Sequence, residues 1–256
     1  INMANQSDSR VSRHKQNNPK KRSVGSILLK IIISLFIFAC IVLVAGAGLF
    51  MFYAKDAPEL SEDELDATVS SKLYAANGEI FQDIGSEKRE EISPTEVPQQ
   101  LEDAIVSIED RRFYKHIGVD PIRIAGSAFS NVTTGGKQGG STLTQQLIKL
   151  SYFSTSEKDQ TLKRKAQEAW LAVKLERQKS KQEILTYYIN KVYMSNGLYG
   201  MQTAAESFYG KPLEELSLAQ TAMIAGMPNA PNYYDPYEHQ EEAKERRDTV
   251  LYTMLD

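Results

Sequence analysis

The chain has 256 residues, of which 41% are hydrophobic and 25% are charged, values typical of a globular protein rather than a disordered, collagen-like or disulfide-rich chain. Its formal net charge of -3 argues against nucleic-acid binding as its main function. One cysteine and three histidines are too few for an internal disulfide or a structural zinc cluster.

The first notable feature along the chain is an uncharged segment at residues 31–54. As a helix it would span roughly 36 Å, enough to cross a hydrocarbon core of ~30 Å. It is longer than the apolar part of a cleaved signal peptide and ends in bulky residues rather than at a small-residue cleavage site. The segment is therefore predicted to be a retained transmembrane helix.

The charges on either side of this segment predict its orientation. Residues 1–30 carry seven basic and one acidic side chain, whereas residues 55–70 carry one basic and six acidic side chains. Positive flanks remain on the cytoplasmic side of a membrane. We therefore expect a basic cytoplasmic tail at 1–30, one pass through the cell membrane at 31–54, an acidic juxtamembrane linker at 55–70 and an extracytoplasmic domain at 71–256.

The external region is predicted to be mainly α. Asn77-Gly78, between two short apolar stretches within residues 72–85, indicates a β-hairpin. A glycine-rich stretch at 133–140 indicates a flexible break, and Ser180 with Glu183 forms a capping-box pattern. Helical periodicity begins at 98, 141, 161, 180, 217 and 238, and residues 228–236 are predicted to form a loop.

Glu109 and Asp110 are the first candidates for chemistry. Glu109 follows Ile105 by four residues and so lies on or beside the apolar stripe of its helix. A carboxylate in that position is partly desolvated, which suits it to accept a proton. The alternative is that the pair ends the helix and bonds to Arg111 or Arg112.

The segment from Gly139 to Leu150 has glycines entering a helix whose first turns are rich in hydroxyl and amide side chains. Free N–H groups at a helix start suit an anion such as phosphate. The spacing does not match a Walker A loop. The alternative is that Ser141 is only an N-cap and that the glutamines are exposed.

A basic cluster, Lys163 to Lys165, lies one turn before Glu168. Arg164 and Glu168 are i,i+4 neighbours and would pair on a solvated helix face. The functional alternative is a cationic cluster for a pyrophosphate, with the carboxylate positioning the cluster or holding a metal ion.

Taken together, these segments resemble the peptidoglycan glycosyltransferase family (family 51), as found in the N-terminal part of class A penicillin-binding proteins. Five segments match the family's motifs in order. They are Glu109-Asp110 with Phe113, His116 and Gly118; Gly140-Ser141-Thr142 with Thr144-Gln145-Gln146; Arg164-Lys165 with Glu168; Ile184-Leu185, Tyr187 and Asn190 with Gly197 and Gly200; and Leu216–Gln220 with Ala225–Pro228.

The resemblance implies a mainly α, lysozyme-like head with a small membrane-associated jaw that includes parts of residues 118–138. It implies that lipid II is joined to a growing glycan strand by an inverting transfer that releases undecaprenyl pyrophosphate. It also implies moenomycin-type inhibitors and the cell-wall synthesis machinery as partners. A C-terminal transpeptidase domain, usual in this family, is expected to be absent from this chain.

The resemblance assigns roles to individual residues. Glu109 is the expected general base, and Glu168 is expected to orient the basic cluster or hold Mg²⁺ or Mn²⁺, a requirement that the sequence leaves open. The expected substrate-binding residues are Asp110, Ser141, Thr142, Gln145, Gln146, Lys149, Arg164 and Lys165.

Two other functions compete with this interpretation. A lysozyme-like hydrolase or lytic transglycosylase would also use a carboxylate in an α head, but it would have no pyrophosphate leaving group for the basic cluster to stabilise. A non-catalytic, membrane-anchored cell-wall scaffold would leave Glu109 and Glu168 replaceable.

Overall fold

The computed structural model describes residues 24–66, 71–74, 80–84, 88–135, 139–154 and 161–255. The chain divides into two compact units, one ending at Leu49 and the other beginning at Phe50. Helix α1 (Val24–Ala54) contains an apolar stretch, Ile27–Ala54, that is long enough to cross a membrane. The predicted membrane helix therefore exists as a helix, while the predicted basic tail falls outside the described residues up to Ser23.

The acidic segment after α1 is folded onto the second unit over residues 55–66. It contains the short helix α2 (Glu62–Leu65), whose Leu65 joins the hydrophobic core. The Tyr152 hydroxyl bonds to the backbone N–H and carbonyl of Ser61 at 2.8 and 2.9 Å. The Lys191 ammonium donates to the carbonyls that end α2. Residues 55–66 of the predicted linker, called the strap below, are thus docked on the second unit. Residues 67–70 lie outside the described part.

The predicted hairpin is confirmed. Strand β1 (Ser71–Tyr74) pairs antiparallel with β2 (Ile80–Ile84), although the Asn77-Gly78 turn lies outside the described residues. A second, two-residue pairing joins β3 (Lys88–Arg89) in parallel to β4 (Leu198–Tyr199).

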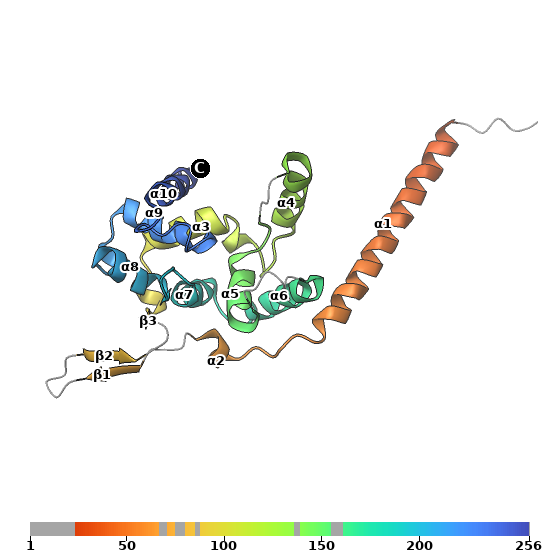
Figure 1. Cartoon of the computed structure of the whole chain (residues 1–256). Helices are drawn as coiled ribbons and strands as arrows, with labels where there is room; N and C mark the ends of the chain where they lie inside the picture. Colours follow the sequence, from red (N-terminus) through yellow and green to blue (C-terminus); the bar gives the residue numbers. More distant parts are fainter. Residues whose placement is uncertain are drawn as a thin grey trace, which may run out of the picture. The chain divides into compact units, whose positions relative to one another are not determined.

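Helices make up most of the described chain, which confirms the mainly α prediction (Figure 1). The longer helices of the second unit are α3 (Gln99–Glu109), α4 (Pro121–Thr134), α5 (Leu143–Tyr152), α6 (Leu162–Leu175), α7 (Lys181–Lys191), α8 (Met201–Tyr209), α9 (Leu218–Gly226) and α10 (Gln240–Met254). Short 3-10 turns lie at Pro94–Glu96, Phe113–Lys115, Leu213–Glu215 and Met227–Asn229.

Local capping explains where several helices begin. Thr161, Ser180 and Ser217 accept backbone N–H bonds at the starts of α6, α7 and α9, because their hydroxyls satisfy donors that lack an intrahelical partner. The start of α5 differs from the prediction. Thr142 is its N-cap, in a capping box with Gln145, so that the side chain of Ser141 is left outside the helix.

Helix α4 corrects the start of the predicted break at 133–140, of which residues 136–138 lie outside the described part. The helix continues through Thr134 and ends at Gly135, which has φ +66°. It lies within the region that the resemblance assigns to a jaw, and in Figure 1 it stands away from the other helices of its unit. Ile122, Phe129 and Val132 on it are 63, 73 and 87% exposed, so α4 buries little of its apolar surface.

The remaining helices of the second unit form two packed groups. Helix α5 packs on α6 and α7, while α3 packs on α9 and α10; α8 contacts both α7 and α9. The apolar stripe predicted for α3 is buried, since Leu101, Ala104 and Ile105 are completely inaccessible. The two groups therefore share one hydrophobic core, and the polar ends of α3 and α5 meet where the groups adjoin.

Candidate active site

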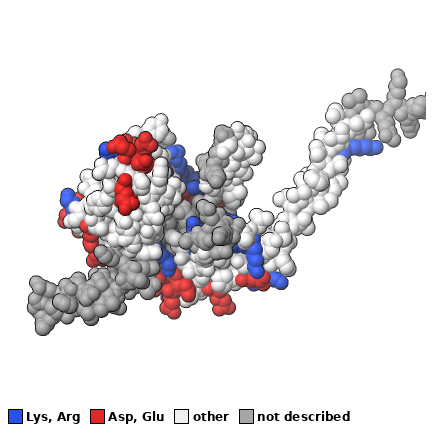
Figure 2. All heavy atoms as spheres, in the orientation of Figure 1, with Lys and Arg blue, Asp and Glu red and all other residues white. Residues whose placement is uncertain are grey.

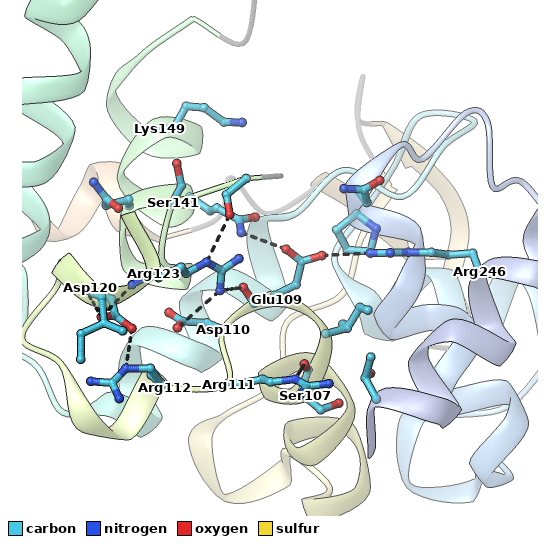
Figure 3. A pocket seen from close by; sticks show the side chains of 18 of the residues that line it. Ser107, Glu109, Asp110, Arg111, Arg112, Asp120, Arg123, Ser141, Lys149 and Arg246 are labelled. Carbon is cyan, nitrogen blue, oxygen red and sulfur yellow. Dashed lines mark hydrogen bonds and ion pairs between the residues drawn. The ribbon is translucent and has the colours of Figure 1, made fainter. Parts of the chain in front are cut away.

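A cavity of about 740 Å³ lies where α3, α4, α5, α6 and α10 converge (Figure 3). It gathers many of the candidate residues from separate parts of the chain. Those in its wall are Glu109, Asp110, Ser141, Gln145, Gln146, Lys149 and Lys165. Thr142, Arg164 and Glu168 are not in its wall.

Glu109 is the last residue of α3, and its side chain is about 10% exposed. One carboxylate oxygen, Oε2, accepts a hydrogen bond from Gln146 Nε2 at 3.0 Å. The other, Oε1, lies 3.4 Å from Arg246 Nη2. Both oxygens are therefore fixed by donors from other helices, as expected for a buried charge. Of the two arginines considered as alternative partners, Arg112 pairs instead with Asp120, at 2.8 Å.

Asp110 caps the C-terminus of α3, and its buried carboxylate points into the protein. Its Oδ2 accepts from the backbone N–H of Leu143 at 3.0 Å and lies 2.8 Å from His116 Nε2. The other ring nitrogen of His116 accepts from the Gly118 N–H at 3.2 Å, so the Nε2 hydrogen must point to Asp110. Asp110 thus ties the start of α5 to the loop after α3.

At the start of α5, the neighbouring candidates Ser141 and Thr142 have different surroundings. The Thr142 hydroxyl is buried; it donates to the Gly118 carbonyl at 2.6 Å and accepts from the Gln145 N–H. Ser141, directly before it, stays at the cavity wall with its hydroxyl 3.2 Å from Lys165 Nζ. Because its hydroxyl is used within the fold, Thr142 holds the helix, whereas Ser141 lines the cavity.

The cavity wall carries more positive than negative charge. Its six basic side chains outnumber its three carboxylates, and Figure 2 shows Lys and Arg side chains in the hollow beside α4. Burial, together with the nearby charge of Lys165, lowers the pKa of Lys149 below its usual 10.5. Such a surface suits an anionic ligand, because a nearby negative charge favours the charged form of the ammonium groups that burial disfavours.

Arg164 and Glu168 form the predicted i,i+4 pair, but of the two alternatives for this cluster the pair on a solvated face is wrong. Arg164 is 5% exposed and the Glu168 carboxylate is inaccessible. Arg164 Nε lies 3.1 Å from one Glu168 oxygen, and Lys165 Nζ lies 2.7 Å from the other. Glu168 therefore orients Lys165 from behind the cavity wall.

The surroundings of Glu168 do not fit a bound metal ion. Both of its oxygens already face a cationic nitrogen, which would repel Mg²⁺ or Mn²⁺. Within the described part of the chain, no group of three His, Cys, Asp or Glu side chains is close enough to hold one.

Comparison with known proteins assigns the family. The family model described as Transglycosylase matches residues 77–255, which is more than half of the chain. The chain belongs to the transglycosylase family. The matched region contains the whole cavity wall, including every residue proposed from the sequence.

Two streptococcal relatives of this transglycosylase chain confirm the resemblance to class A penicillin-binding proteins, specifically to penicillin-binding protein 1A of streptococcus-like bacteria. Penicillin-binding protein 1A of Streptococcus oralis is 63% identical over 82% of this chain and 33% of that protein. Penicillin-binding protein 1A of Streptococcus pneumoniae is 58% identical over 83% of this chain and 30% of that protein. The chain thus spans about a third of the length of these relatives.

A solved structure also matches this transglycosylase chain. The match to the 2.6 Å crystal structure of penicillin-binding protein 1A from Haemophilus influenzae covers 74% of this chain and 19% of the chain in that structure, at 25% identity and a TM-score of 0.42.

Two arginines of the transglycosylase cavity were not proposed from the sequence. Arg123 on α4 donates to the Glu109 carbonyl and lies 3.6 Å from Asp110 Oδ1. Arg246 on α10 contacts the Glu109 carboxylate across 137 residues of sequence. The Asp120-Pro121 pair, a typical N-cap followed by a proline in the first turn, could have revealed α4 and with it Arg123. No local pattern marks Arg246.

Proposed function

We propose that this chain is a peptidoglycan glycosyltransferase that polymerises lipid II, a disaccharide-pentapeptide on undecaprenyl pyrophosphate, into β-1,4-linked glycan. The observation that carries the proposal is the placement of one carboxylate, Glu109, in the same cavity wall as the cations Lys149 and Lys165. Membership of the transglycosylase family supports it. Transfer of a sugar from a pyrophosphate requires both a base and a cationic site.

Glu109 is the proposed general base. The 4-hydroxyl of the acceptor sugar is a weak nucleophile, so its proton must be taken up as its oxygen bonds to C1 of the donor. Gln146 and Arg246 stabilise the charged carboxylate that receives this proton. The bond from C1 to the phosphate oxygen breaks on the opposite face, so the anomeric centre inverts.

Lys149 and Lys165 are proposed to stabilise the departing pyrophosphate. Negative charge builds on the leaving oxygen as its bond to C1 breaks, and fixed cations at that point lower the barrier. Glu168 holds Lys165 in place at 2.7 Å, and Ser141 adds a hydroxyl beside the same ammonium group. Arg164 contributes from behind by pairing with Glu168.

Helix α1 is proposed to anchor the enzyme in the cytoplasmic membrane with its catalytic domain outside. A lipid-linked donor lies in the plane of the membrane, so an anchored enzyme meets a higher local concentration of it. The exposed apolar residues of α4, Ile122, Phe129 and Val132, support contact of this helix with the lipid surface. The cell-wall synthesis machinery is the corresponding proposed partner.

The basic cavity wall favours this function over the two alternatives. A glycan hydrolase has no anionic leaving group that would need Lys149 and Lys165 beside the base. A non-catalytic scaffold would have no use for a carboxylate with a donor on each oxygen.

The test is polymerisation of labelled lipid II by the detergent-solubilised chain, with products resolved on a gel. Glu109→Gln keeps the shape of the side chain but removes its ability to accept the proton, so we expect at least about a 100-fold loss of rate. Glu102→Gln is the matched control, because it makes the same change on the same helix outside the cavity wall. It should polymerise at the wild-type rate.

Four results would contradict the proposal or a part of it. If Glu109→Gln polymerises at the wild-type rate, Glu109 is not the general base. If folded wild-type protein makes no polymer, this chain does not have the proposed activity. Cleavage of preformed glycan without polymerisation would favour a hydrolase. Moenomycin-type phosphoglycolipids should compete with lipid II, and their failure to bind would argue against the pyrophosphate site.

A further inference from the structure

Gly226, the last residue of α9, has a backbone that does not require glycine. Its φ and ψ of -81° and -26° are ordinary helical values. Glycine is usually unfavourable in a helix compared with alanine. The space around the residue supplies the reason for its presence. A Cβ at this position would lie 3.0 Å from Arg246 Cγ and 3.1 Å from Val250 Cγ2.

Because Gly226 has no Cβ, the aliphatic part of the Arg246 side chain can pass across the end of α9. The same glycine also holds the guanidinium, because its carbonyl accepts from Arg246 Nε at 3.0 Å. Carbonyls at a helix C-terminus lack intrahelical donors and attract cations. The ring of Tyr234, 5.6 Å from Arg246 Cζ, supports the group further. Arg246 is therefore fixed between α9 and the loop that follows it.

This placement brings Arg246 Nη2 to 3.4 Å from Glu109 Oε1. The second oxygen of Glu109 is held independently by Gln146, whose own carbonyl oxygen faces the Tyr188 hydroxyl at 3.4 Å. Since that hydroxyl donates to the amide oxygen, the amide NH₂ points to Glu109. Each carboxylate oxygen thus has one fixed donor, which defines the direction in which its free lone pairs face the cavity.

We propose that Gly226 is a positioning residue for catalysis: it allows Arg246 to cross α9 and hold Glu109 in the orientation that accepts the substrate proton. This inference rests on the proposed role of Glu109 as the base. It gives a catalytic consequence to a glycine in the fifth family-like segment, which contributes no charged or nucleophilic side chain to the cavity at that position.

The test compares Gly226→Ala, Arg246→Ala and the double variant, measuring kcat and KM for lipid II polymerisation. Misplacing a catalytic group by about 1 Å can cost about 100-fold in rate. We expect each single variant to lose about 10- to 100-fold in kcat with little change in KM. Arg246→Ala removes the Cγ that the new Cβ would meet and leaves only the contact with Val250 Cγ2, which does not touch Glu109, so the double variant should have about the same kcat as Arg246→Ala alone.

Three further variants serve as controls. Arg247→Ala removes a charge from the next position of α10, where the arginine pairs with Asp248 outside the cavity wall, and should keep the wild-type kcat. Arg246→Lys keeps the charge and should recover part of the kcat that Arg246→Ala loses. Glu109→Gln establishes whether Glu109 is the base.

A wild-type kcat for Gly226→Ala, or multiplied losses in the double variant, would overturn the positioning role. If Glu109→Gln is inactive while Gly226→Ala and Arg246→Ala are fully active, only this inference fails. If Glu109→Gln keeps its activity, the proposed base fails and the positioning role fails with it.

Discussion

Replacing Gly118 by alanine should destabilise the second unit, which begins at Phe50, by forcing the backbone of residue 118 away from α6. Gly118 has φ +91°, a conformation that residues with a Cβ rarely adopt. A Cβ there would lie 2.5 Å from the Ala172 carbonyl carbon and 2.6 Å from both the Ala172 oxygen and the Val173 nitrogen. These are backbone atoms inside a helix, so they cannot rotate away.

The cost has two parts. Left-handed backbone strain for an L-residue is about 1–2 kcal/mol, and forcing atoms into a packed region costs about 1–3 kcal/mol more. We therefore expect Gly118→Ala to lower the free energy of unfolding by about 2–5 kcal/mol. Gly210→Ala is the matched control: Gly210 has φ +64° but no atom within 4 Å of its added Cβ, so only the strain of about 1–2 kcal/mol applies.

The assay is urea unfolding followed by tryptophan fluorescence. Trp170 is the only tryptophan in the sequence and lies on α6, the helix that Gly118 contacts, so the fluorescence reports on the unfolding of the second unit. Equal losses of stability in Gly118→Ala and Gly210→Ala would refute the argument, because the close approach to Ala172 would then carry no energetic consequence.

Three other predictions concern the cavity and the strap. Because burial and Lys165 lower the pKa of Lys149, its positive charge is lost at a lower pH than usual; polymerisation should fall as pH rises towards 10.5, and Lys149→Arg should extend activity to higher pH in a rate profile. Burial alone would raise the pKa of Asp120. Hydrogen bonds from the backbone N–H groups at the start of α4, together with the charge of Arg112, have a larger effect and lower the pKa of Asp120 below 3.8. Asp120→Ala should therefore lower the free energy of unfolding by about 1–2 kcal/mol at neutral pH, as measured by urea unfolding. The difference between variant and wild type should disappear as the pH falls through the lowered pKa of Asp120, because the carboxylate of the wild type is then protonated. Lys191→Met should release the carbonyls that end α2 and speed limited proteolysis in residues 60–66, and an unchanged cleavage rate would argue against a docked strap.

The helices that bury a regular apolar stripe could be predicted from sequence. In α3 the spacing of Leu101, Ala104 and Ile105 agrees with their complete burial. The starts of α6, α7 and α9 follow from hydroxyl side chains that satisfy local backbone donors. Helix α4 also has apolar residues at helical spacing, Ile122, Phe129 and Val132, but the prediction missed this helix, and the structure leaves the three side chains exposed instead of burying them in the core.

The candidate site could be predicted only in part. The sequence placed Glu109 near an apolar helix face and a helix start at Ser141, and the structure brings both residues to one cavity. It could not distinguish Ser141, which faces the cavity, from Thr142, whose hydroxyl caps α5 and bonds to Gly118. Both residue types are good caps, so tertiary contacts decide which one remains available.

The sequence by itself determined the features that depend on neighbouring residues: the apolar helix near the N-terminus, the hairpin, the helix caps and the ordered segments that indicate the family. Only the tertiary structure decided how Glu109 is held. Its contact with Arg246 joins residues 137 positions apart and depends on how α9 and α10 pack on α3. The burial of Arg164 and Glu168 was likewise decided by packing, because i,i+4 spacing fixes which residues meet on a helix but not whether that face meets water.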